Sequence, residues 1–263
     1  MIQSLRCEGV GPAKEFGPIE FSPRLNIFTG DNGLGKSFIL ELLWLIISNT
    51  WTHKKPLSAR RDSCQGFIHT KYSIENGQIT EDIISVPSYG LDTKRRDNIH
   101  FKNTIGIYIN PDGGASVWDG FKHDPYRSTS SYYSSEAFNF TQEDIFLGII
   151  DGKSGKLCNG LINDWVLWQK SNDPAFNALK EALAILSPPD INKLNIGEPV
   201  RLGYESTNYP SLASPDGIDI PIIHASSGAR RIASLAYLII WAWYEHLNIF
   251  SHLEVAPVKQ FFC

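Results

Sequence analysis

The sequence has few cysteines, no cysteine pair of the C-x-x-C kind and no long apolar run. The four cysteines are scattered, at Cys7, Cys64, Cys158 and Cys263. The spacing of these cysteines is not typical of a zinc site, and a reduced, cytoplasmic setting is the simplest prediction. The longest apolar run, 232–244, is shorter than the roughly 20 residues that span a bilayer. No secretory signal is recognisable at the N-terminus. We therefore predict no membrane partner and a buried helix at 232–244.

The chain also has no excess of positive charge. Its formal net charge is −4, so no overall basic field attracts nucleic acid. Local basic clusters could still contact nucleic-acid phosphates, although solvent-facing loops explain them equally well: Lys54, Lys55, Arg60, Arg61, Lys94, Arg95 and Arg96. With 42% hydrophobic and 20% charged residues, the 263-residue chain is typical of one large globular domain, 1–263, with or without an insertion.

One short stretch carries clear chemistry, and it reads G-x-x-x-x-G-K-[ST]. It consists of Gly30, Asp31, Asn32, Gly33, Leu34, Gly35, Lys36 and Ser37. Glycines let the backbone curl so that its N–H groups point at phosphate oxygens. In such a loop the lysine reaches the β- and γ-phosphates and the serine hydroxyl ligates Mg²⁺. We predict that this stretch holds the triphosphate of a nucleotide with Mg²⁺, with Ser37 as the metal ligand and Lys36 in a catalytic role.

The flanks of the motif agree with this prediction. Residues 24–29 read as a short buried strand, and residues 38–47 read as a largely buried helix that continues to about Asn49. The positive end of that helix would add to the attraction for phosphate. Strand, loop and helix in this order predict an α/β fold.

The rest of the chain divides by composition. Residues 1–29 predict a β-meander, and about 50–140 predict a β-rich, loop-rich insertion with a hairpin at Asn76-Gly77 and an exposed loop at 122–135. Residues 141–187 predict helices, including one through 145–150. A further helix is expected within 222–247.

A second informative stretch, residues 225–231, lies at the start of that last helix. Ser226 and Gly228 supply a hydroxyl and free N–H groups at the positive end of the helix, which suits another anion. A plain serine N-cap is the alternative explanation. Arg230 or Arg231 could face a γ-phosphate or form a surface salt bridge.

The order and spacing of these motifs resemble the ABC-type P-loop NTPases of the RecF/SMC/OLD branch. Asn32 matches that branch's G-x-N-G-x-G-K-[ST] loop, and Ser226 and Gly228 match its Ser-x-Gly signature. The resemblance implies that the signature of one subunit contacts the γ-phosphate held by another, so that ATP is sandwiched in a homo-oligomer.

The resemblance extends furthest to the ATPase subunit of Septu-type antiphage defence systems, which also occur with retrons. Residues 25–37, 159–165 and 224–243 carry it. It implies a partner HNH nuclease that the ATPase controls.

One departure from the family concerns hydrolysis. ATP hydrolysis by this class needs a strand of apolar residues followed by Asp-Glu, the Walker B element, after the signature helix. The segment 252–263 contains no such pattern. We expect a member that is truncated at the C-terminus, binds nucleotide and hydrolyses it poorly on its own.

Two rival functions stay open at this point. A compact GTPase or kinase could use Asp151, which ends an apolar run, to order Mg²⁺. A nucleic-acid-binding or scaffolding module could use ATP only to set its assembly.

ABC-type sites contain a glutamine that senses Mg²⁺. Gln142 is one candidate for this residue.

Overall fold

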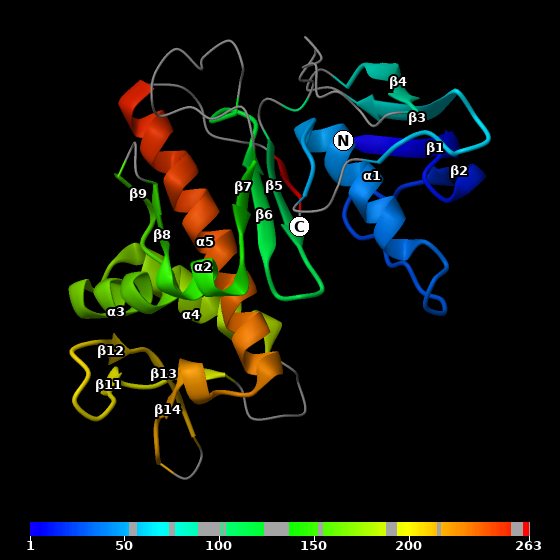
Figure 1. Cartoon of the computed structure of the whole chain (residues 1–263). Coiled ribbons are helices and arrows are strands. Elements are labelled where there is room, and N and C mark those ends of the chain that lie inside the picture. The colour runs from blue at the N-terminus through cyan, green and yellow to red at the C-terminus, as the bar shows by residue number, and fades with distance from the viewer. Residues whose placement is uncertain are drawn as a thin grey trace. The chain divides into compact units, whose positions relative to one another are not determined.

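The computed structural model describes residues 1–52, 57–73, 77–88, 101, 104–123, 137–151, 155–187, 194–214, 217–253 and 260–262 (Figure 1). The chain divides into two compact units, Met1–Lys102 and Asn103–Cys263. The prediction of one domain over 1–263 stays a prediction. Of the helices in the described part of the chain, none combines the length and apolar character needed to cross a bilayer.

The first unit is built on a four-stranded antiparallel sheet in the order β2-β1-β3-β4. Its strands are β1 (Ile2–Val10), β2 (Ala13–Glu20), β3 (Gln65–Ser73) and β4 (Ile79–Pro87). Residues alternate between buried and exposed along β3, as expected of a sheet with one covered face. The β3–β4 pairing confirms the predicted hairpin, and Asn76 itself lies outside the described residues.

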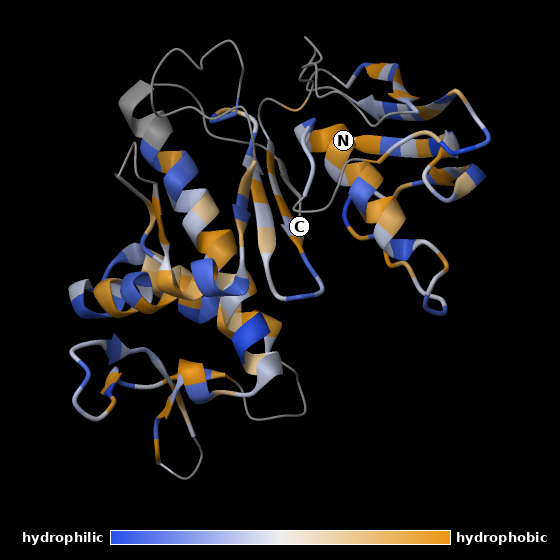
Figure 2. Ribbon diagram, in the orientation of Figure 1, coloured by the Kyte–Doolittle hydropathy of each residue, from blue (hydrophilic) through white to orange (hydrophobic). Residues whose placement is uncertain are grey.

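Helix α1 (Lys36–Ser48) covers the buried face of this sheet. Apolar residues run along most of the helix (Figure 2). Ile39, Leu42 and Leu45 pack with Leu5, Ile68 and other buried strand residues in one cluster. The helix predicted after Lys36 is confirmed, and it ends at Asn49, whose positive φ of 52° makes the C-cap. The phosphate-loop motif is thus attached to a helix fixed by the core of its own unit.

The strand predicted at 24–29 is wrong. These residues have irregular backbone, and Leu25 and Ile27 are 69% and 74% exposed. The side chain of Asn26 accepts a hydrogen bond from the Ser22 N–H and donates one to the Ser22 carbonyl, which closes a local turn. The described residues of the first unit offer no neighbouring strand for this segment to pair with, so alternating apolar residues alone did not produce a ladder.

The second unit contains another four-stranded sheet, in the order β15-β5-β6-β7. Its strands are β5 (Thr104–Ile109), β6 (Ala115–Asp119), β7 (Phe138–Phe140) and β15 (Gln260–Phe262). The β5–β6 and β6–β7 pairs are antiparallel, and β15 lies parallel to β5. Helix α5 (Ser227–Leu253) packs on this sheet and supplies Ala233, Tyr237 and Trp241 to the larger core (Figure 1). The apolar run at 232–244 is therefore a core helix, as predicted.

Helices α2 (Gln142–Leu147), α3 (Leu161–Ser171) and α4 (Pro174–Leu186) complete this core. The helix predicted through 145–150 is wrong at its C-terminal end, because Gly148 (φ 89°) caps α2 and residues 149–151 form a strand. That strand, β8 (Ile149–Asp151), pairs with β9 (Gly155–Cys158).

Short strands lead into α5. They are β10 (Asn195–Ile196), β11 (Val200–Arg201), β12 (Asn208–Tyr209), β13 (Ser211–Ala213) and β14 (Ile220–Pro221), followed by the 3₁₀ turn η2 (Ile222–His224). β13 pairs with β10 and β14, so the segment that precedes the signature residues is held by a small sheet.

Candidate functional site

The loop before α1 has the backbone that its glycines predict. Gly30, Gly33 and Gly35 have φ values of 140°, 87° and 86°, a region that disfavours residues with a Cβ. A Cβ added to Gly33 or Gly35 would meet no atom within 4 Å. The positive φ values of these glycines therefore come from the tight turns of the loop, and the space beside Gly33 and Gly35 is open. This is the form needed for a loop whose backbone approaches a ligand.

Lys36 folds back onto the same loop. Its ammonium donates hydrogen bonds to the carbonyls of Gly30 (2.8 Å) and Asp31 (2.7 Å). The positive charge is thus held at the loop whose N–H groups would face phosphate. A lysine ammonium is a compact point charge suited to binding phosphate oxygens.

The N-terminus of α1 is uncapped by any side chain. Its N-cap is Gly35, and the first helical hydrogen bond runs from the Ile39 N–H to the Gly35 carbonyl at 3.0 Å. The N–H groups of Lys36, Ser37 and Phe38 consequently have no acceptor inside the helix, and the first turn carries no acidic residue. An anion would satisfy these donors and the helix dipole together. The residues present therefore fit a triphosphate.

The remaining residues of the predicted loop are accessible. Asp31, Asn32, Leu34 and Ser37 are exposed, and Ser37 begins the first turn of α1 beside Lys36. The Ser37 hydroxyl is the one side-chain group of this turn with the chemistry of a Mg²⁺ ligand. In the described part of the chain, no three His, Cys, Asp or Glu residues are grouped so that they could hold a metal ion.

The second predicted anion site lies in the other unit, at the start of α5. Ser226 is its N-cap, and the Ser226 hydroxyl oxygen accepts a hydrogen bond from the Ala229 N–H at 3.2 Å. The hydroxyl proton remains able to donate. Gly228 is exposed, and a Cβ added there would meet no atom within 4 Å. No described atom of the chain therefore requires a glycine at this position.

The two arginines after the signature differ in their surroundings. Arg231 is tied down, because its guanidinium donates to the Pro111 carbonyl at 2.5 Å. Arg230 is half-buried, and its Nε has no hydrogen-bond partner among the described residues. Of the two, Arg230 is the better candidate for a ligand contact.

Comparison with known families finds one match. Residues 4–154, more than half of the chain, match the family described as AAA domain. The chain belongs to the AAA domain family. A search of curated proteins finds no match.

Membership of the AAA domain family indicates an ATPase-type, nucleotide-binding function, and such proteins typically use Mg²⁺. The matched region of this AAA domain includes the loop at 30–37 and ends before Ser226 and Gly228. The family match therefore bears on the phosphate loop and leaves the signature residues as predictions.

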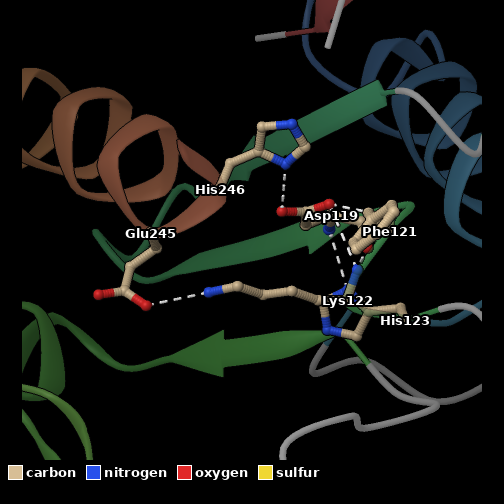
Figure 3. A network of polar contacts seen from close by, with 6 residues as sticks. All are labelled: Asp119, Phe121, Lys122, His123, Glu245 and His246. Carbon is tan, nitrogen blue, oxygen red and sulfur yellow. Dashed lines mark hydrogen bonds and ion pairs between the residues drawn. The ribbon is translucent and has the colours of Figure 1, made fainter. Parts of the chain in front are cut away.

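A buried polar network in the second unit was missed by sequence reasoning (Figure 3). Asp119 at the end of β6 contacts His246 of α5, with 2.7 Å between Oδ2 and Nδ1, and both are buried. The Lys122 ammonium reaches Glu245 Oε2 at 3.0 Å. The partners of each pair lie more than 120 residues apart, so no local pattern could have indicated them.

The same network corrects the exposed loop predicted at 122–135. Lys122 and His123 are buried, and residues 124–135 lie outside the described residues. The two side chains turn inward because Asp119 accepts hydrogen bonds from backbone N–H groups just after it, including that of Phe121 at 2.9 Å. His123 packs against the rings of Trp118 and Phe138.

The surroundings of Asp119 and His123 shift the pKa values of these two groups. Burial is the largest influence on Asp119 and opposes its ionisation. The hydrogen bond and charge of His246, the Phe121 N–H and Lys122 outweigh burial, and together they hold the pKa of Asp119 below its ordinary value. Burial lowers the pKa of His123 to about 4. Asp119 is thus ionised and His123 neutral near pH 7.

The remaining candidates have the following positions in the structure. Gln142 is the first residue of α2, close to Gly113. Asp151 ends β8. Arg60 forms an exposed ion pair with Asp62 at 2.8 Å, and of the other basic residues Lys54, Lys55, Lys94, Arg95 and Arg96 lie outside the described residues.

Proposed function

We propose that this AAA domain binds ATP with Mg²⁺ at residues 30–37 and acts as the ATP-binding subunit of an ABC-type ATPase of the RecF/SMC/OLD branch. The observation that carries the proposal is the Lys36 ammonium held at a glycine-lined loop, beside an uncapped helix N-terminus. Backbone N–H groups and Lys36 would bind the β- and γ-phosphates, and the Ser37 hydroxyl would ligate Mg²⁺. Bound Mg²⁺ neutralises charge on the phosphate oxygens.

Ser226 and Gly228 would act on the γ-phosphate held by a second copy of the chain. This proposal is supported by the exposed position of both residues at a helix N-terminus and by the open space around Gly228. A glycine there lets another molecule approach the backbone closely. The proposed assembly is therefore a homo-oligomer formed around ATP.

We expect this chain to hydrolyse ATP poorly on its own. The 263 residues contain no Asp-Glu pair, and β15, the described strand that follows α5, consists of Gln260, Phe261 and Phe262. In the ATPases that the chain resembles, an Asp-Glu pair in this order follows an apolar strand, orders Mg²⁺ and polarises the attacking water, and this supports the expectation.

The biological role that we propose is control of a partner nuclease of the HNH type, as in Septu-type antiphage defence. The support is the sequence resemblance at 25–37, 159–165 and 224–243. Co-expression of the chain with an HNH nuclease of a Septu-type system tests this role. Co-purification in a fixed ratio is expected, and separate elution of two well-folded proteins would contradict it.

Nucleotide competition tests the proposed site against the GTPase or kinase alternative. A fluorescent ATP analogue bound to the chain should be displaced by ATP at least tenfold more effectively than by GTP, and only with Mg²⁺ present. Ser37→Ala should weaken the Mg²⁺ dependence, because it removes the proposed metal ligand. Preferential displacement by GTP would favour the alternative that uses Asp151.

A further inference from the structure

A cavity of about 470 Å³ lies between β9, α3, the start of α4 and α5, all within the second unit. This volume is within the range of small-molecule sites. Three aromatic residues line it, Trp168, Trp241 and Tyr244, and three carboxylates do so as well, Asp164, Asp173 and Glu245. Among the described residues that line it, none is a lysine, an arginine or a histidine.

The wall of this cavity already binds one ammonium group. Lys122 is not among the described residues that line the cavity, yet its Nζ lies 3.0 Å from Glu245 Oε2 (Figure 3). The same Nζ lies 5.8 Å from the ring centroid of Trp241. Both of these partners line the cavity. The combination of a carboxylate and an aromatic face is the recognised chemistry for binding organic cations. Two residues of the cavity wall, Glu245 and Trp241, thus already contact an ammonium group.

A second carboxylate, Asp173, and another ring, that of Tyr244, also line this cavity. Asp173 is the N-cap of α4, and one of its oxygens accepts the Ala175 N–H at 2.8 Å. Burial and, after it, the charge of Asp173 raise the pKa of Tyr244, so this carboxylate acts on the Tyr244 hydroxyl. Asp173 and Tyr244 are both half-buried and can reach a molecule in the cavity.

We infer that this cavity binds an organic cation, an alkylammonium or guanidinium group, against Asp173, Glu245 and the rings of Trp168 and Tyr244. The cation is either a free polyamine or the end of a lysine or arginine side chain, since the two share this chemistry. The inference does not depend on nucleotide binding, because none of the cavity residues belongs to the loop at 30–37.

Calorimetry on the full chain tests the site with small probes. Butylguanidinium and butylammonium should each saturate one site at millimolar concentration, whereas butylurea, a neutral molecule of the same shape as butylguanidinium, should not. Spermidine and N-acetylarginine amide then distinguish the source: tighter binding of spermidine indicates a free polyamine, and tighter binding of the arginine compound indicates a protein side chain.

Two variants and a matched control localise the binding. Asp173→Asn removes a charge and keeps an N-cap residue, and Tyr244→Leu removes a ring, so each should weaken cation binding roughly fivefold to tenfold. Glu181→Gln, on the exposed face of α4, should change nothing. Any of three results would overturn the inference. They are equal binding of butylurea, no cation binding at millimolar concentration and a 20-fold molar excess over the chain, and unchanged binding in both variants.

Discussion

Folding keeps the side chain of His123 neutral near pH 7. The free energy of unfolding should therefore depend on pH. Its pKa is about 4 in the folded chain against 6.5 ordinarily, so the unfolded chain binds more protons between these values. The free energy of unfolding should therefore fall as pH decreases from about 6.5 to 4, by on the order of 3 kcal/mol. Urea unfolding followed across this range measures it.

The His123→Gln variant provides the control for that pH dependence. It should be less stable at pH 7, because a buried ring is lost, but its stability should vary less between pH 6.5 and 4. Asp119 does not confuse the test, since its lowered pKa places its loss of stabilisation below pH 3.8. An unchanged slope in the variant would refute the assignment.

The second prediction at this scale concerns the contribution of the Asp119–His246 pair to the free energy of unfolding. Both side chains are buried, so Asp119→Ala leaves His246 without the carboxylate that holds its Nδ1 at 2.7 Å. Removal of one member of a buried pair typically costs about 3–5 kcal/mol. The exposed pair of Lys71 and Glu81 is the control, and Glu81→Ala should cost less than about 1 kcal/mol. Similar losses for the two variants in urea unfolding would contradict the account.

At the scale of the element, a substitution of Gly228 at the start of α5 distinguishes a structural role of this residue from a functional one. Gly228 is in the first turn, where alanine is the better helix former, and an added Cβ would meet nothing. Gly228→Ala should leave stability unchanged or raise it by up to about 1 kcal/mol. If a second copy approaches here, the same variant should weaken ATP-dependent self-association at least tenfold. Sedimentation velocity with and without ATP measures this.

The elements also show what sequence patterns can and cannot predict. Helix α1, the β3–β4 hairpin and the core helix α5 followed from periodicity and turn residues, because their signals lie within about 20 residues. The strand predicted at 24–29 failed because a strand also needs a partner, which sequence alone does not provide. The contact between Asp119 and His246 spans 127 residues, so only the fold brings them together. The motif at 30–37 can be recognised in the sequence because its residues are contiguous, and its role in phosphate binding stays a prediction.

At the scale of the whole molecule, binding and hydrolysis should be separable. We expect the purified chain to bind ATP while its steady-state turnover stays at the background level of the Lys36→Ala variant. The reason is that no Asp-Glu pair is present in the 263 residues to order Mg²⁺ and polarise water. A phosphate-release assay measures the turnover. Turnover typical of an ATPase that Lys36→Ala abolishes would show that another carboxylate fulfils this role.

Titration calorimetry of the full chain with ATP and Mg²⁺ tests the central claim most directly. The account predicts one saturable site per chain, and Lys36→Ala should weaken binding by roughly 10- to 100-fold, as expected for the loss of hydrogen bonds from a charged group. Lys180→Ala, an exposed lysine of α4, should bind like the unaltered chain. No uptake of ATP at millimolar concentration by well-folded protein, or equal uptake by the Lys36→Ala variant, would contradict the account.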